Sequence, residues 1–472
     1  MALAPDVSSS TDPNPVTDDT PPVDAPGLQY FVMGLFFIFG GITSLNDVII
    51  PKLKELFTLS YTEAMLVQFC FFAAYLIIGI PGAKLVKKIG YMRGAVAGLC
   101  TMIVGCLLFI PASQTATYAI FLGALFILAS GVVIVQVVAN PLISLLGPPS
   151  TTHSRLTFAQ AFNSLGTTVF PIVGAAIILG SLAEVSADQL EGAALQAYRA
   201  AESEAIWQGY LGVAALIALV AAAVWMFRNR LPHDAKIMGE GDLVSNSRYL
   251  IGLALAALGA FVALQVSGLL GVLVILTAPA LWLYDNDLLK RARFSYGALC
   301  IFLYVGAEVS IGSIIINYLS TERVLGEPES VIGWMIGLYW GGAMVGRFIG
   351  SAALRMFSPG KILAFNATGA ITLIIISALT SGEFAAYTLL AVGLMNSIMF
   401  PTIFSLACEK LGPRAADGSG IINVAIFGGA VVPLLYGVVA DATGGNLALA
   451  MVIPIVCYAI IAGFGIFARR PA

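Results

Sequence analysis

Residues 28–51 read LQYFVMGLFFIFGGITSLNDVIIP, an apolar run long enough to cross a bilayer as a helix. Near its end the run carries a carboxylate, Asp47. A carboxylate at the centre of a membrane helix costs about 3 kcal/mol. The run therefore indicates a membrane-spanning helix whose acid is stabilised by water or by polar neighbours.

The composition extends this conclusion to the whole chain. Of the 472 residues, 59% are hydrophobic and 10% are charged, whereas soluble domains carry about 25% charged residues. Apolar blocks of membrane-spanning length recur along the sequence, and a β-barrel would show short alternating segments instead. We expect an all-α polytopic membrane protein. Residues 1–27 contain no Lys or Arg and are rich in Pro, Asp, Ser and Thr, which predicts a disordered tail and not a signal peptide.

Twelve strong spans can be counted. They cover residues 28–50, 61–82, 94–112, 117–145, 156–180, 206–227, 295–319, 330–353, 361–380, 384–408, 418–440 and 446–468. A further apolar stretch, 249–285, is too long for one ordinary crossing and has Gly268 and Gly271 near its middle. We interpret this stretch as a helical hairpin, which brings the crossings to fourteen.

The distribution of basic residues supports this count. With a cytoplasmic N-terminus, all of the 23 Lys and Arg residues fall on the inner side except Lys52, Lys54, Arg199 and Arg323, as the positive-inside rule requires. Because basic residues flank both sides of 249–285, that stretch must cross an even number of times. Both termini are then cytoplasmic.

An internal repeat places the working centre. The segments VQVVANP (135–141) and MNSIMFP (395–401) both end in proline, and 22 residues separate Pro141 from Asn163 as they separate Pro401 from Asn423. At this offset of 260 residues, Gln136 aligns with Asn396 and Asn163 with Asn423. The pattern predicts two six-helix halves in parallel orientation, with amides facing each other near the midplane.

Polar side chains inside the spans are candidates for a substrate site. Gln136 and Asn140 share one helix face, as do Gln160 and Asn163. Amides both donate and accept hydrogen bonds, which suits a polyhydroxylated solute. The alternative is that they hold helices together, at about 0.6 kcal/mol each.

Two acids and one aromatic residue complete the candidate site. Glu308 is the most central acid, and it lies on the first helix of the second half as Asp47 does in the first. A buried carboxyl can take up a proton on one side and release it on the other. The alternatives are an interfacial carboxylate at Asp47 and simple hydrogen bonding at Glu308. Trp340 is the best candidate to stack on a sugar ring, although most membrane aromatics pack or anchor at the interface.

Other chemistries find no support in the sequence. We see no Walker motif, nucleotide loop, zinc spacing or nucleophile elbow, so we expect no enzyme, cofactor or metal and no nucleic-acid partner. The six cysteines fit small buried hydrophobes. His153 and His233 are expected as solvated residues of inner loops. Active transport would then depend on an ion gradient.

Several segments carry a family resemblance. The turns GAKLVKKIGYMRG (82–94) and GRFIGSAALRMFSPGK (346–361) resemble the loop motif of the major facilitator superfamily, with Val86 at the position of its aspartate. The runs TSLNDVIIPKLKELF, VQVVANPLISLLGPP, RLTFAQAFNSLGTT, YVGAEVSIGS and FPTIFSLACEKLG strongly resemble the fucose–galactose–glucose:proton symporter family of that superfamily. The resemblance covers roughly 28–227 and 294–468. It implies the major facilitator fold, alternating access and proton-coupled sugar uptake.

The resemblance also assigns roles to residues. Asp47 matches the family's proton-coupling acid, and Gln160 and Asn163 match its sugar-lining pair. The fucose branch has glutamate where this chain has Gln136, which favours the glucose/galactose branch and leaves Glu308 as a second acid. The expected substrate-binding residues are Asn46, Gln136, Asn140, Gln160, Asn163, Trp340, Asn396 and Asn423.

We therefore expect a monomeric hexose:proton symporter of the bacterial inner membrane. Its domains would be a tail (1–27), a first half (28–227), a linker with the hairpin (228–293), a second half (294–468) and a tail (469–472). N-acetylglucosamine or fructose as substrate, sodium coupling and facilitated diffusion stay open. From another class, a sugar receptor without transport also stays open.

Overall fold

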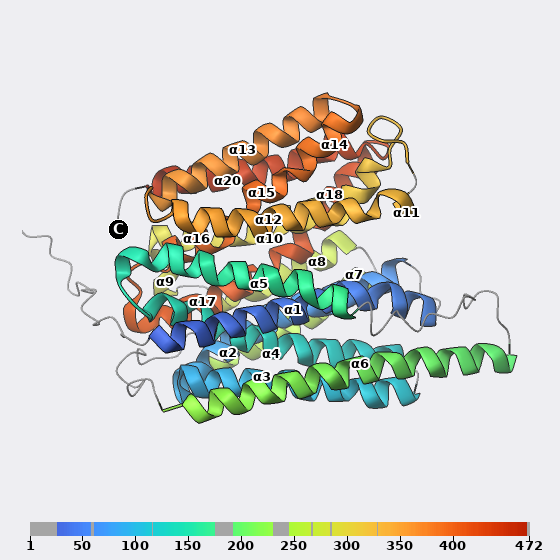
Figure 1. Cartoon of the computed structure of the whole chain (residues 1–472), viewed down its shortest axis with the longest axis horizontal. Coiled ribbons are helices and arrows are strands. Elements are labelled where there is room, and N and C mark those ends of the chain that lie inside the picture. The colour runs from blue at the N-terminus through green and yellow to red at the C-terminus, as the bar shows by residue number, and fades with distance from the viewer. Residues whose placement is uncertain are drawn as a thin grey trace, which may run out of the picture.

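The computed structural model describes residues 26–57, 61–115, 117–174, 192–229, 245–265, 268–283, 286–327 and 329–469. These residues form helices that lie roughly along one common direction (Figure 1). No β-strand occurs among them, and ten of their helical segments are long and apolar enough to cross a membrane. The expectation of an all-α membrane fold is confirmed.

The first half comprises six long helices and one short turn. They are α1 (Pro26–Phe57), α2 (Tyr61–Ile89), α3 (Tyr91–Thr115), α4 (Tyr118–Leu145), η1 (Pro149–Thr151), α5 (Thr152–Gly174) and α6 (Gly192–Phe227). The turn between α2 and α3 consists of Gly90, whose φ of 88° lies in the left-handed region that glycine adopts without strain. Gly90 alone therefore separates the end of α2 from the start of α3.

The second half has more interruptions. It consists of α10 (Ala292–Leu319), α11 (Glu329–Ile332), η5 (Gly333–Met335), α12 (Ile336–Ala353), α13 (Pro359–Leu379), α14 (Gly382–Leu390), α15 (Val392–Asn396), α16 (Met399–Ala407), η6 (Gly412–Arg414), α17 (Ala415–Ala425), α18 (Gly428–Ala442), α19 (Leu447–Ala450) and α20 (Val452–Phe467). The last three spans expected from the sequence are therefore each divided into shorter helices.

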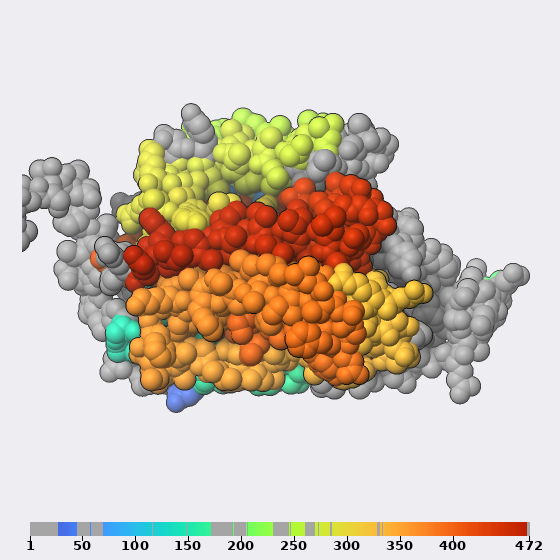
Figure 2. Space-filling model, turned by 90° about the horizontal axis from the view of Figure 1, so that it is seen from above, coloured from blue at the N-terminus to red at the C-terminus, as the bar shows by residue number. Residues whose placement is uncertain are grey.

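Three further helices join the halves, namely α7 (Asn246–Gln265), α8 (Gly268–Leu283) and α9 (Asp287–Lys290). The Tyr249 ring of α7 stacks on Trp282 of α8 with 5.1 Å between ring centroids. The Tyr249 hydroxyl donates to the Ile77 carbonyl of α2 at 2.7 Å. The α7–α8 pair lies along one flank of the bundle (Figure 2). That this pair crosses the membrane twice stays a proposal, as do the domain boundaries.

Helix packing repeats between the halves. In the first half α1 packs on α5 and α3 on α6, and in the second half α10 packs on α18 and α13 on α20. Glycines permit the corresponding contacts: a Cβ on Gly166 would lie 2.8 Å from the Gly41 nitrogen, and one on Gly306 would lie 2.9 Å from the Gly428 oxygen. Such small residues let membrane helices approach closely.

The two halves meet where α5 contacts α12 and α16, and where α2 contacts α17. We call this contact the seam. One end of the bundle, on the left of Figure 1, holds the start of α1 and the end of α20. We call it the basic end, because Lys87, Arg155, Arg293, Arg355 and Arg469 belong to helix ends there.

Candidate substrate and coupling site

Asn396 is the centre of a buried polar network in the second half. Its Nδ2 donates to the Tyr339 hydroxyl at 2.8 Å, and its Oδ1 accepts from the Tyr458 hydroxyl at 2.8 Å. The side chain has no exposed surface. Both ends of this amide are therefore engaged within the protein, so a ligand could bind it only by displacing a tyrosine.

The backbone next to Asn396 is interrupted because Pro401 has no N–H to donate to the Ser397 carbonyl. Arg347 of α12 donates from Nε to that carbonyl at 3.0 Å. The two preceding carbonyls also accept from side chains. The Met395 oxygen accepts from Asn366 at 2.8 Å, and the Asn396 oxygen accepts from Tyr304 at 3.1 Å. Side chains from α10, α12 and α13 thus donate hydrogen bonds to the carbonyl groups at the break between α15 and α16.

Glu308 belongs to the same network. Its Oε1 accepts from the Tyr304 hydroxyl at 2.7 Å, and its backbone oxygen accepts from Tyr339 at 3.3 Å. The positive charge of Arg347 acts on this carboxylate. Glu308 therefore has both a hydroxyl donor and a compensating cation, as an acid within a membrane bundle requires.

The first half holds its amides differently. Nε2 of Gln136 donates to the Tyr75 hydroxyl at 3.1 Å, while Oε1 of Gln136 is buried without a hydrogen-bond partner. Nε2 of Gln160 donates to Oδ1 of Asn140 at 3.4 Å. Buried polar atoms are nearly always paired, so the free Gln136 acceptor is a place where a ligand hydroxyl or a water can donate.

The second repeat-related pair is partly engaged. Asn163 donates from Nδ2 to the Phe36 carbonyl at 3.4 Å, across the close α1–α5 contact. Asn423 donates from Nδ2 to Ser419 of its own helix at 2.8 Å, and its Oδ1 is buried without a partner. Among the described residues, each half thus contains one buried amide oxygen without a hydrogen-bond partner, on Gln136 and Asn423 respectively.

The remaining candidates are only partly defined. Asn46 and Asp47 lie in α1, and their side chains fall outside the part of the chain that the structure describes. Trp340 is 39% exposed. Its ring meets Tyr339 edge-on at 5.0 Å, and the ring lies beside Gly312 of α10. A stacking role for Trp340 and all assigned roles in substrate binding stay predictions.

Arg347 is a functional candidate that the sequence did not single out. It is 9% exposed and reaches across the seam, where its Nη1 donates to the Gln160 carbonyl at 3.3 Å and to the Ser164 hydroxyl of α5. Tyr304 and Tyr458 were missed as well. Two features of the sequence could have indicated these residues: Arg347 stands within an apolar run, and Tyr304 precedes Glu308 by one helical turn.

An ion pair closes the seam at the basic end. Nζ of Lys87, at the end of α2, lies 3.1 Å from Oδ2 of Asp417, in the first turn of α17. Arg414 lies 3.3 Å from the same oxygen. Val86, at the position of the motif's aspartate, is buried. In this chain the last turn of α2 therefore supplies the cation of the cross-seam pair, and α17 supplies the anion.

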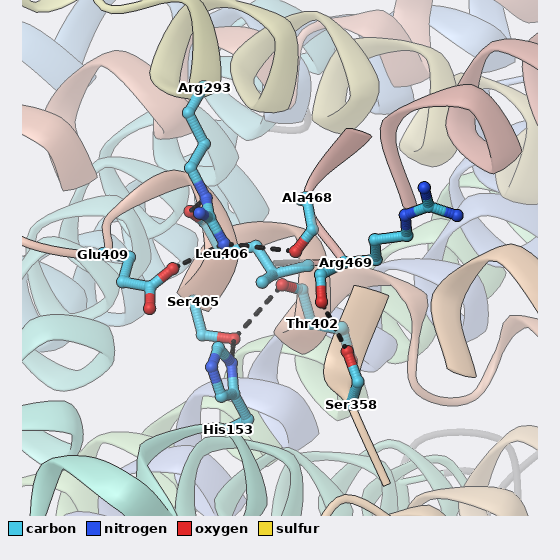
Figure 3. Close-up of polar contacts among 9 residues, drawn as sticks. All are labelled: His153, Arg293, Ser358, Thr402, Ser405, Leu406, Glu409, Ala468 and Arg469. Carbon is cyan, nitrogen blue, oxygen red and sulfur yellow. Dashed lines mark hydrogen bonds and ion pairs between the residues drawn. The ribbon is translucent and has the colours of Figure 1, made fainter. Parts of the chain in front are cut away.

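A second contact across the seam involves His153, which is not the solvated loop residue expected from the sequence. Its Nδ1 lies 2.6 Å from the Ser405 hydroxyl of α16 (Figure 3). The Ser405 hydroxyl donates to the Pro401 carbonyl at 2.7 Å. Burial, together with the positive charge of Arg293, lowers the pKa of His153 from 6.5 to about 4. His233 lies outside the described residues.

Further contacts hold this end together. Ser154 donates to the Ser351 carbonyl at 2.8 Å, and Arg355 donates to the Ser154 hydroxyl at 3.1 Å. Arg293 pairs with Glu409 at 2.5 Å (Figure 3). In the described residues, no group of three or more His, Cys, Asp or Glu side chains could hold a metal ion.

Fold and site together define a multi-pass membrane transporter of small solutes. The family profile described as Major Facilitator Superfamily matches residues 32–433, and the chain belongs to this superfamily. It is 45% identical to a glucose/galactose transporter of Brucella abortus over 436 residues, 92% of either chain. It is 32% identical to the L-fucose-proton symporter of Escherichia coli, over 93% of this chain and 92% of that one.

A solved structure agrees in fold. The crystal structure of the Major Facilitator Superfamily transporter FucP in the outward conformation superposes with a TM-score of 0.78 and 30% identity, covering 94% of this chain and 99% of that chain. The family resemblance inferred from the sequence is confirmed, as is the conclusion that the chain is a transporter and not an enzyme.

Proposed function

We propose that the protein imports glucose or galactose together with a proton, by alternating access of a central site to the two sides of the bacterial inner membrane. The observation that carries this proposal is the combination of partly free amides in the first half with a half-buried, hydrogen-bonded acid in the second. The names of the two relatives, a glucose/galactose transporter and an L-fucose-proton symporter, support the solute and the ion.

The sugar would bind between the halves. The unpaired oxygens of Gln136 and Asn423 accept from sugar hydroxyls, and the Gln160 and Asn163 side chains line the same region. A hydroxyl that fills an unpaired buried acceptor contributes about 1 kcal/mol or more. Asn46, Asn140, Asn396 and Trp340 complete the proposed set.

The proton would be carried by Asp47 and Glu308. Glu308 is the acid whose surroundings the structure describes, with Tyr304 as hydroxyl donor and Arg347 as nearby charge. When both acids are neutral and the sugar is bound, the cost of exposing charge during the transition falls, so the loaded carrier can reorient. The basic end is proposed to face the cytoplasm, in line with the positive-inside rule, and the protein is proposed to act as a monomer.

The closed seam at the basic end supports an outward-facing arrangement. In that state a sugar enters from the opposite side, and import requires the contacts of Lys87 with Asp417 and of His153 with Ser405 to break.

The test is uptake of radiolabelled D-glucose into proteoliposomes under an inward proton gradient, with and without a protonophore and with sodium varied separately. Protonophore-sensitive accumulation that is independent of sodium is expected. Sodium-driven accumulation would change the ion, and equilibration without accumulation would indicate a facilitator. Sugar binding without uptake would indicate a receptor. Absence of uptake by folded protein would direct the test to N-acetylglucosamine, fructose and L-fucose.

A further inference from the structure

Within the part of the chain that the structure describes, the hydrogen-bond acceptors of Arg347 are all neutral groups at the seam. Nε donates to the Ser397 carbonyl within the second half, while Nη1 donates to the Gln160 carbonyl and the Ser164 hydroxyl in the first. Only 9% of the residue is exposed. A buried guanidinium is costly without a compensating anion. Among the described residues of the second half, Glu308 is the acid whose negative charge interacts with Arg347.

A short hydrogen-bonded path also joins the two residues. The Tyr304 hydroxyl donates both to Oε1 of Glu308, at 2.7 Å, and to the Asn396 carbonyl, at 3.1 Å. The Ser397 carbonyl, one residue further along, accepts from Arg347 at 3.0 Å. Pro401 leaves that carbonyl without a helical donor. The break between α15 and α16 thus lies directly between the acid and the arginine.

We propose that Arg347 is the positioning residue that couples the charge on Glu308 to the contact between the halves. An ionised Glu308 draws the guanidinium toward the second half and weakens its bonds to α5. When Glu308 is neutral, the guanidinium keeps its full hydrogen bonds to Gln160 and Ser164. The contact between the two halves is then stronger. The proton alone then stabilises the closed basic end, and reorientation waits for a sugar at the neighbouring amides.

This coupling is the one a symporter needs. A carrier that reorients with a proton but without sugar dissipates the gradient, so the protonated, sugar-free protein has to stay closed at the basic end. The bonds of Arg347 to α5 hold the two halves together at this end. One of them is to the backbone of Gln160, a proposed sugar-binding residue, so a bound sugar can act on the same contact. The inference rests on the proposed function, which names the proton and the sugar.

The titratable groups around this pair can be named. Tyr304, Tyr339 and Tyr458 face Glu308 from α10, α12 and α20, and Arg347 faces it as the cation. His153 titrates elsewhere on the same seam. A test at one fixed pH, near 8, keeps His153 neutral and removes its contribution.

The test is a double-mutant cycle on the opening of the basic end. Spin labels at Lys88→Cys and Met356→Cys, both exposed positions of that end, report the ratio of closed to open molecules in a chain freed of its native cysteines. The variants are Glu308→Gln, Arg347→Gln, and the two combined. Neither sugar nor a proton gradient is present, so failure of the uptake assay would leave this test informative.

With Arg347 present, Glu308→Gln is expected to raise the closed-to-open ratio about threefold or more. With Arg347→Gln, the same change at Glu308 should alter the ratio by less than about 1.5-fold. Arg347→Lys keeps the charge and should restore part of the coupling. A purely structural role of Arg347 would make the two single effects additive.

Arg355→Gln is the matched control. Arg355 also bonds to α5 across the seam, through Ser154, but it belongs to the end of α12 and not to the Glu308 network. The Glu308→Gln effect should persist in full in this variant. The inference is overturned if Glu308→Gln has no effect with Arg347 present, if its effect survives Arg347→Gln, or if Arg355→Gln abolishes it too.

Discussion

Gln136 and Asn396 are matched by the internal repeat predicted from the sequence, and their side chains are hydrogen-bonded in different ways. The Gln136 amide has one bond to Tyr75 and a buried oxygen without a partner. The Asn396 amide is bonded at both its nitrogen and its oxygen, to Tyr339 and Tyr458 respectively. At this pair of positions, the first half leaves an amide oxygen free to accept from a solute, while the second half uses its amide to connect α12, α15 and α20 next to Glu308.

The largest expected effect is on coupling. Glu308→Gln should reduce gradient-driven glucose accumulation to simple equilibration, because the side chain can no longer release a proton. A gradient of two pH units could otherwise drive a concentration ratio of up to about 100, near 2.7 kcal/mol. Exchange of labelled for unlabelled glucose at equal pH should persist and serves as the control. Undiminished accumulation would remove Glu308 from the mechanism.

The next effect is on stability. Asn396→Ala would leave the buried hydroxyls of Tyr339 and Tyr458 without their amide partner, at an expected cost of about 1–3 kcal/mol. Thermal unfolding in detergent measures it. Asn423→Ala is the matched control, since that side chain bonds only within its own helix turn, and its loss should be smaller. Equal losses of stability in the two variants would contradict the structural role assigned to Asn396.

Gln136→Ala should act mainly on affinity, and its cost in stability should be smaller than that of Asn396→Ala because it removes one bond to a buried tyrosine and not two. Losing one acceptor for a sugar hydroxyl is worth about 1.4 kcal/mol, or tenfold in Kd. Calorimetric titration with D-glucose tests this. Ser130→Ala, on the same helix, removes a hydroxyl that bonds to its own backbone at Phe126 and should leave Kd unchanged. An unaltered Kd in Gln136→Ala would remove this residue from the sugar site.

The smallest effect concerns pH at the basic end. The pKa of His153 is lowered to about 4 where it contacts Ser405, so a proton binds more strongly once the halves separate. The stabilisation from this contact is full above pH 6.5 and is lost as the pH falls toward 4. The spin-label pair at Lys88 and Met356 should report more opening in this window than it does in His153→Gln. An identical response in the two proteins would exclude His153 as a titrating contact.

The helical membrane architecture was predictable because apolar length and basic-residue asymmetry are local properties of the sequence. The interruption after Asn396 follows from Pro401 in retrospect, but which donors satisfy the freed carbonyls depends on three other helices. The partners of Lys87 and His153 lie 330 and 252 residues away in the sequence. Only the packing of one half on the other determines such contacts, so they could not be read from local sequence.

The most direct test of the central claim is the pH of a lightly buffered medium around proteoliposomes when D-glucose is added without any imposed gradient. Proton–sugar symport predicts that the medium becomes more alkaline as glucose enters, and that a protonophore abolishes the change. Glucose entry with no change in external pH would contradict the account, because the sugar would then cross without the proton that Glu308 and Asp47 are proposed to carry.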